Sequence, residues 1–210
     1  LPQKILDKLD WLFGCIVRNI YAIITPINPT QIMLISFQGD FTCNPKYIYK
    51  ALKDKPNNYN YVFSARKTSM SNGTFPPDTK LDEQYSADYY QEIAKSKVII
   101  ANSVELFKKP MLIKKQQIVI ETWHGSLGIK RFGEHDNKGK TWVAAGKRCG
   151  KRANYIISNS DFENDVYRDT FWKTTEILKY GHPRNDILFN KESNFLESTR
   201  SKVLHRNAEL

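Results

Sequence analysis

Hydrophobic residues recur at helical spacing over residues 3–24 and in short strand-like runs over most of the remaining chain. In the first segment the apolar positions repeat every three or four residues, which predicts one amphipathic helix. The apolar stripe covers more than half of the helix circumference, so two interpretations stay open. The helix could pack against a domain core, or it could lie on a membrane surface. The excess of Lys and Arg elsewhere favours the second, because cytoplasmic leaflets are anionic.

Beyond Pro26 and Pro29, apolar runs alternate with loops and amphipathic stretches. Six runs are typical of buried strands: residues 32–37, 59–64, 98–101, 118–122, 155–158 and 176–179. This alternation predicts an α/β domain with a Rossmann-like, mainly parallel sheet covered by helices on both faces.

Three helices are expected between these strands, over residues 44–52, 86–95 and 160–171. Asn44 is the expected N-cap of the first, with Pro45 in its first turn. Ser160 and Glu163 have the spacing of a capping box, which predicts the start of the last helix.

Polar residues follow the predicted strands where each one ends. These positions are Gln38-Gly39-Asp40, Asn102-Ser103, Trp123-His124-Gly125, Asn159-Ser160 and Gly181-His182. Because parallel strands place their carboxyl ends at one edge of a sheet, we expect these groups to collect there and form the functional site.

His124 is the strongest candidate for acid–base chemistry. An imidazole titrates near neutral pH and is suited to removing a proton from an alcohol. The flanking Trp123 and Gly125, and the cation Lys130 shortly after, favour a ligand site over a purely structural histidine.

The turn Gly181-His182-Pro183-Arg184-Asn185-Asp186 is a second candidate. Arg184 has the geometry to bind a phosphate at two points. The alternative is a helix-capping turn, in which Asn185 or Asp186 caps the next helix and Arg184 pairs with a carboxylate.

Composition narrows the class of partner. The 210 residues carry 32 Lys and Arg against 22 Asp and Glu, a net charge of +10, which favours an anionic partner. Between residues 130 and 152 eight basic residues cluster, either as a solvated face or as a surface for a polyanion: Lys130, Arg131, Lys138, Lys140, Lys147, Arg148, Lys151 and Arg152. No aromatic interleaving typical of a nucleic-acid platform is present, so a nucleic-acid partner is not expected.

Other classes are disfavoured. The longest apolar run is interrupted by Arg18 and Asn19, so neither a membrane span nor a signal peptide is expected. Three separated cysteines predict free thiols, and no metal signature or Gly-rich phosphate loop is found. No metal and no tightly bound cofactor are therefore expected.

Taken together, the motifs resemble those of the CDP-glycerol glycerophosphotransferases of teichoic acid and capsule synthesis. The matching segments are residues 35–39 with Asn44-Pro45 and Tyr49, Thr122-Trp123-His124-Gly125 with Lys130, residues 158–160, and residues 181–186. The resemblance extends from about residue 30 to residue 190.

That resemblance implies a GT-B-like architecture of two Rossmann-like domains that face a cleft. It implies transfer of glycerol phosphate, or a similar polyol phosphate, from CDP-glycerol to a lipid-linked acceptor at the inner face of the cytoplasmic membrane. His124 would be the general base or a key acceptor-side residue. The residues expected to bind substrate are Gln38, Gly39, Trp123, Gly125, Lys130, Ser160, Arg184, Asn185 and Asp186.

Three regions follow from this comparison. Residues 1–28 would be the amphipathic helix, 29–182 the acceptor-side domain, and 183–210 the crossover into a donor-binding domain beyond the chain. The chain would then be a fragment that is inactive alone. It has Ser126-Leu127 where many members have Thr-Pro, which leaves the acceptor open. A sugar-nucleotide glycosyltransferase of the same architecture, or a non-catalytic domain that binds an anionic polymer, are the alternatives.

Overall fold

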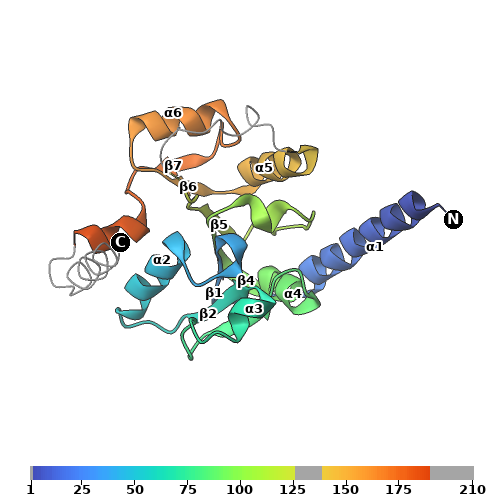
Figure 1. Ribbon diagram of the computed structural model, residues 1–210, viewed down its shortest axis with the longest axis horizontal. Helices are drawn as coiled ribbons and strands as arrows, with labels where there is room; N and C mark the ends of the chain where they lie inside the picture. Colours follow the sequence, from blue (N-terminus) through green and yellow to red (C-terminus); the bar gives the residue numbers. More distant parts are fainter. Residues whose placement is uncertain (1, 126–138, 190–210) are drawn as a thin grey trace, which may run out of the picture.

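The computed structural model describes residues 2–125 and 139–189, which form a seven-stranded sheet with helices on both faces (Figure 1). The strands are β1 (Asn28–Ile35), β2 (Asn60–Ala65), β3 (Lys80–Glu83), β4 (Ser96–Ala101), β5 (Ile118–Glu121), β6 (Tyr155–Ile157) and β7 (Glu176–Leu178). Their order is β3-β2-β1-β4-β5-β6-β7, and every neighbouring pair is parallel. This confirms the predicted Rossmann-like α/β fold. The chain direction across the sheet reverses between β1 and β4, where such folds bind ligands.

All six predicted strands are present, and one more lies at the sheet edge. The strand β3 was outside the prediction because Leu81 is its single apolar residue. An edge strand with so little apolar character gives almost no hydrophobic signal.

Six α-helices are described: α1 (Gln3–Ile24), α2 (Cys43–Lys53), α3 (Lys67–Met70), α4 (Ala87–Lys95), α5 (Lys140–Arg152) and α6 (Asp161–Asp169). Short 3-10 helices follow β1, β4 and β7: η1 (Phe37–Gly39), η2 (Val104–Phe107) and η4 (Pro183–Leu188). Ser160 is the N-cap of α6, as predicted, and its Oγ accepts the Glu163 N–H at 3.2 Å. The return bond differs from that of a capping box, because the Glu163 carboxylate accepts the N–H of Asn159, one residue before the N-cap, at 2.7 Å.

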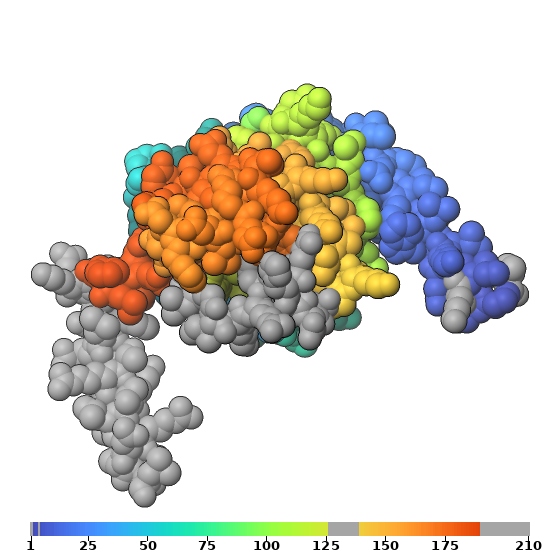
Figure 2. All heavy atoms as spheres, turned by 90° about the horizontal axis from the view of Figure 1, so that it is seen from above, coloured from blue at the N-terminus to red at the C-terminus, as the bar shows by residue number. Residues whose placement is uncertain are grey.

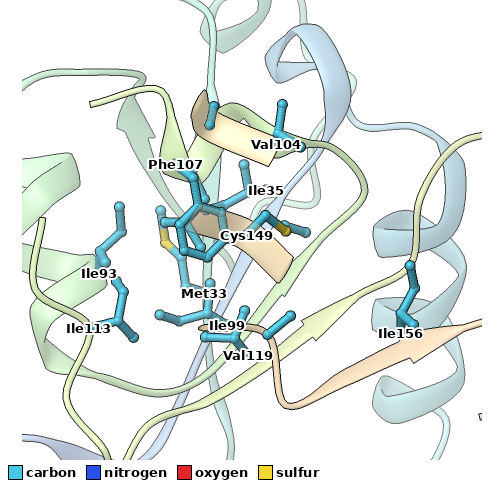
Figure 3. Packing of buried hydrophobic residues seen from close by; sticks show 14 of the residues in the cluster. Met33, Ile35, Ile93, Ile99, Val104, Phe107, Ile113, Val119, Cys149 and Ile156 are labelled. Atoms are coloured by element: carbon cyan, nitrogen blue, oxygen red, sulfur yellow. The ribbon is translucent and has the colours of Figure 1, made fainter. Parts of the chain in front are cut away.

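The core is divided between the two faces of the sheet. On one face, Met33, Ile99 and Val119 pack against α4, α5 and η2 (Figure 3). On the other, Leu34 packs with Tyr49 of α2. Successive strand residues therefore serve opposite faces, and with both faces covered the strands are almost continuously apolar.

Helix α1 is fixed to the domain at its C-terminal end. Arg18 is buried there, donates from Nε to the Pro110 carbonyl at 3.0 Å, and lies 5.3 Å from the centre of the Tyr90 ring. Asn19 Oδ1 accepts the Leu112 N–H at 2.9 Å. The polar residues that interrupt the apolar run are therefore the anchor of the helix.

The rest of α1 projects from the body (Figures 1 and 2). Ten large apolar side chains of this helix are more than a third exposed, among them Leu12 at 51% and Phe13 at 69%. Packing against the domain core therefore accounts for the part of α1 around Arg18 and Asn19, and it leaves these ten exposed apolar side chains unexplained. Within the described residues, no helix is both long and apolar enough to cross a bilayer.

Helix α5 is absent from the sequence prediction, which placed a basic cluster there. Its buried face consists of small residues, Ala145, Gly146, Cys149 and Gly150, at helical spacing. A Cβ atom on Gly150 would lie 1.8 Å from the Phe171 carbonyl oxygen, so these small residues allow close approach of the segment after α6. A face of this kind contributes little apolar area, so the segment is dominated in sequence by the basic residues on its other side.

Candidate active site

Asn102, the first residue after β4, connects the ends of β1 and β5, the two strands that flank β4. Its side-chain oxygen accepts the Phe37 N–H at 2.6 Å, just beyond β1. Its carbonyl oxygen lies 2.6 Å from His124 Nδ1, just beyond β5. The side chain is fully buried, and no hydrogen bond to its Nδ2 is found among the described residues. The predicted edge is thus organised around the switch point of the sheet.

The imidazole of His124 is half-buried and fixed in orientation. A carbonyl oxygen can only accept a hydrogen bond, so the neutral ring carries its proton on Nδ1 and its lone pair on Nε2. The ring stacks on Phe37 with centroids 4.9 Å apart and planes 11° apart. A ring held in this way can act as a general base.

Trp123 adopts an unusual backbone conformation directly before His124. Its φ of 48° lies in the left-handed region, which a bulky residue rarely occupies. Its indole is buried in the core, 5.4 Å from the ring of Trp172. The side chain predicted to bind substrate thus lies among core residues.

The Glu121 carboxylate stabilises the end of β5, shortly before Trp123 and His124. Its Oε1 accepts the Trp123 N–H at 2.9 Å, and the Cys149 thiol lies 3.6 Å from its Oε2. Complete burial raises the pKa of the Glu121 carboxyl to about 8. Burial likewise raises the pKa of the Cys149 thiol well above its ordinary value. Cys149 and the other cysteines are free thiols, as expected.

The prediction that Asn44 is the N-cap of α2 is wrong. The N-cap of α2 is Thr42, not Asn44, and the Asn44 side chain points into the site instead. Its Nδ2 donates to the carbonyls of Thr122 at 3.0 Å and Trp123 at 2.9 Å, and its Oδ1 accepts the Arg184 N–H at 3.2 Å. The first residues of α2 therefore contact both predicted motifs.

Arg184 lies beside the histidine. Its Nη1 donates to the His124 carbonyl at 2.8 Å and lies 3.4 Å from Cys43 Sγ. His182 is buried, with Nε2 3.0 Å from Glu163 Oε1. Asn185 and Asp186 lie inside the element that follows, η4, and a helix that they could cap would begin outside the described residues. The alternative of a capping turn therefore stays open.

The other predicted substrate residues vary in placement. Gln38 and Gly39, at the switch point, have φ values of 62° and 68°, and a Cβ on Gly39 would lie 2.6 Å from the backbone nitrogen of Arg66. Gly125 is exposed beside His124. The Ser160 hydroxyl is used as a helix cap. Lys130 lies outside the described residues.

The basic cluster is partly structural. Arg148 donates to the Phe107 carbonyl at 2.9 and 2.6 Å. Arg152 donates to the carbonyls of Ile113, Lys114 and Gln117. These guanidinium groups hold loops rather than face an anion. Lys147 and Lys151 lie on the exposed side of α5, and Lys130, Arg131 and Lys138 lie outside the described residues.

Asn102 was expected at this edge, because it follows a strand as His124 does, but no role was assigned to it. Three other residues of the site were missing from the predicted set: Phe37, Asn44 and Glu121. Phe37 and Glu121 were assigned to strands, and Asn44 to a cap. No three His, Cys, Asp or Glu side chains among residues 2–125 and 139–189 are grouped closely enough to hold a metal ion.

A family model described as CDP-Glycerol:Poly(glycerophosphate) glycerophosphotransferase matches residues 17–204. The chain belongs to this family. A teichoic acid poly(glycerol phosphate) polymerase of Staphylococcus epidermidis is 29% identical to this chain over 191 residues. The match covers 84% of this chain and 25% of that protein. A polymerase of the same name from Bacillus spizizenii is 26% identical and is matched over 92% of this chain and 51% of its own length.

Solved structures of the wall teichoic acid polymerase TagF share the fold. A histidine-to-alanine variant superposes with a TM-score of 0.72 at 25% identity, over 96% of this chain and 53% of that one. A histidine-to-asparagine variant gives 0.75 at 24% identity, over 95% of this chain and 52% of the other. The chain therefore spans about a quarter to a half of the length of these relatives.

Proposed function

We propose that this chain is the N-terminal, acceptor-side part of a transferase that moves glycerol phosphate, or a similar polyol phosphate, from CDP-glycerol to a lipid-linked acceptor. Membership of the family supports the reaction class. The observation that carries the proposal is the arrangement of His124, whose Nδ1 meets the Asn102 carbonyl while its own carbonyl accepts from Arg184.

In this reaction His124 Nε2 takes the proton of the acceptor hydroxyl. The acceptor oxygen then forms a bond to the glycerol-bearing phosphorus of CDP-glycerol. The bond between that phosphorus and the CMP oxygen breaks, and CMP leaves with the electron pair. The Asn102 carbonyl stabilises the imidazolium that results, because it accepts the hydrogen bond from Nδ1 throughout.

Arg184 supplies positive charge next to the base. With Nη1 held by the His124 carbonyl, the guanidinium is oriented at the same edge. A planar guanidinium beside the reacting groups stabilises the charge on the transferring phosphoryl oxygens. Gln38 and Gly125 are exposed at this edge, where they could contact substrate, and the buried Gly39 lets the backbone of Arg66 approach closely beside them. The neighbouring Asn185 and Asp186 would extend this edge toward the donor.

Donor recognition is assigned to a second domain that begins at residues 183–210. About half of the length of the TagF structures lies outside the region matched by this chain. A structure of a TagF variant soaked with CDPG has the same fold as this chain, with a TM-score of 0.71. The two-domain arrangement would place CDP-glycerol over the carboxyl edge of the sheet.

Helix α1 is the proposed membrane contact. Its exposed apolar side chains suit the interface of a bilayer, and the net charge of +10 favours an anionic leaflet. The protein would then be cytoplasmic and peripheral on the inner face of the membrane, where a lipid-linked acceptor is accessible.

The test is CMP release by the full-length protein with a membrane fraction as acceptor and CDP-glycerol or CDP-ribitol as donor. Wild type is compared with His124→Ala and with Tyr180→Ala, which changes an 84% exposed ring after β7. Release that is lost in His124→Ala and kept in Tyr180→Ala supports the proposal and identifies the donor. Turnover with nucleotide sugars alone would indicate a glycosyltransferase. Polymer binding without turnover would indicate a binding domain.

A further inference from the structure

Three segments that are distant in sequence meet at the side chain of Asn44. These are the start of α2, the tip of β5 and the turn after β7. Asn44 is completely buried, so its amide is not available to solvent. Both ends of the amide are used: Nδ2 donates to two carbonyls and Oδ1 accepts a backbone N–H.

The carbonyls that Asn44 satisfies belong to a strained strand end. Thr122 and Trp123 are buried, and Trp123 has a left-handed φ of 48°. A buried carbonyl without a donor costs about 1–3 kcal/mol. Without Asn44, the tip would lose two hydrogen bonds at the point where the chain turns toward His124.

The same side chain also closes a ring of contacts around His124. Asn44 Nδ2 bonds to the Trp123 carbonyl, the His124 carbonyl accepts from the Arg184 guanidinium, and the Arg184 N–H returns to Asn44 Oδ1. Through this ring, the single amide of Asn44 bonds to the backbone next to His124 and to the backbone of Arg184. An Asp at position 44 would direct a carboxylate at two carbonyl oxygens, and an apolar residue would make none of these bonds.

We infer that Asn44 is a positioning residue that sets His124 and Arg184 at a fixed separation. The catalytic consequence rests on the proposed transferase function. The separation itself does not, because it is a property of the backbone. Asn44 acts through Trp123 and Arg184 and does not touch the reacting atoms.

The first experiment examines the fold and the tip without any substrate. Asn44→Ala and the milder Asn44→Ser are compared with Asn60→Ala, which removes an exposed asparagine bonded to Thr30 Oγ1 on the other edge of the sheet. Amide hydrogen exchange at Arg184 is expected to increase at least about tenfold in Asn44→Ala, since its N–H loses its acceptor. The ¹⁵N shifts of the His124 ring are expected to change. Both should be unchanged in Asn60→Ala.

The second experiment measures steady-state kinetics in the full-length protein. A displacement of about 1 Å in a catalytic group costs about 100-fold in rate, so kcat is expected to fall about that much in Asn44→Ala while KM changes little. The Asn44→Ser variant, which can donate one hydrogen bond, should be intermediate.

The outcomes separate this inference from the proposed function. Folded Asn44 variants with wild-type Arg184 exchange and His124 shifts would overturn it, as would a kcat within about twofold of wild type. If Asn44→Ala does not fold, the same criteria apply to Asn44→Ser. If the wild-type protein does not release CMP, the proposed function fails, and exchange at Arg184 and the His124 shifts still decide the role of Asn44.

Discussion

The ring of Phe37 lies almost parallel to the ring of His124, with centroids 4.9 Å apart and an angle of 11° between the planes. The two residues come from different strand ends, and both are bonded to Asn102, one through its side chain and the other through its carbonyl. The plane of the imidazole is therefore set by a hydrogen bond on Nδ1 and by the Phe37 ring on its face, with the tilted Trp123 ring 4.5 Å away as a further contact. Phe37 is itself 38% exposed, so this face is not required to complete the core.

Replacing Phe37 with Ala is therefore expected to lower kcat with little effect on stability. Loss of the stacked ring removes one of the contacts that orient the His124 plane, which also include the Nδ1 hydrogen bond and the tilted Trp123 ring 4.5 Å away, and we expect kcat to fall about tenfold. Thermal unfolding and CMP release measure the two effects. Phe37→Tyr is the control and should retain activity. An unchanged kcat in Phe37→Ala would show that the Phe37 ring is not needed to orient the base.

Arg184→Lys is expected to reduce kcat/KM for CDP-glycerol about 10- to 100-fold, because a lysine cannot bond to His124 and a phosphate through one planar group. Lys179→Ala is the matched control, since it removes a cation paired with Asp161 from the same end of the sheet. An unchanged kcat/KM in Arg184→Lys would mean that positive charge at this position, not guanidinium geometry, is what the donor requires.

Glu121 predicts a dependence of stability on pH. Its pKa is raised from 4.5 to about 8 by burial, so between these values the folded state keeps a proton that the unfolded state releases. This contribution is complete below about pH 4.5 and is lost as the pH rises toward 8, at up to about 1.4 kcal/mol per pH unit. Glu121→Gln keeps an acceptor for the Trp123 N–H and has no proton to lose.

Denaturant unfolding of wild type and Glu121→Gln at pH 5 and pH 8 measures this contribution. The variant should gain stability relative to wild type at the higher pH. A stability difference that is the same at both values would show that Glu121 titrates normally.

The apolar face of α1 predicts binding to vesicles. Replacing Leu12 and Phe13 with Ser removes two exposed apolar side chains and should lower affinity for anionic vesicles at least about tenfold, without changing the unfolding midpoint. Gln3→Ser, which removes little apolar area, is the control. Vesicle binding that survives the double change would assign the contact to another surface.

Close packing at α5 predicts a stability defect. Gly150→Ala would place a Cβ 1.8 Å from the Phe171 carbonyl, and we expect a loss of about 1–3 kcal/mol or more. The control is Lys151→Ala, at the next and exposed position of the same helix. A wild-type unfolding midpoint in Gly150→Ala would show that α5 shifts readily away from Phe171.

The parts of the fold that the sequence predicted are those with local signals. Apolar runs identified six strands, and the Ser160 and Glu163 spacing identified the start of α6. His124 was found because it directly follows such a run. Helix α5 was not found, because its fully buried face consists of small residues. Its Arg148 and Arg152 bind loop carbonyls that lie 41 and 38 positions away in the sequence, which the sequence alone does not reveal.

The role of Asn44 could not be predicted from local sequence. An asparagine before a proline and an amphipathic stretch satisfies the pattern of an N-cap, yet its partners lie 78, 79 and 140 residues away. Which of the two roles an asparagine takes depends on what the tertiary fold brings beside it.

Those long separations have a consequence for how the protein gains and loses its site. The contacts that fix His124 join residues 22, 60 and 79 or more positions apart, so loops of that size must close before any of them forms. A chain that has paired β1 with β2 but has not yet docked the 181–186 turn contains His124 without the contacts that fix it. A chain that has formed much of the sheet but not these contacts would therefore lack the fixed orientation of His124.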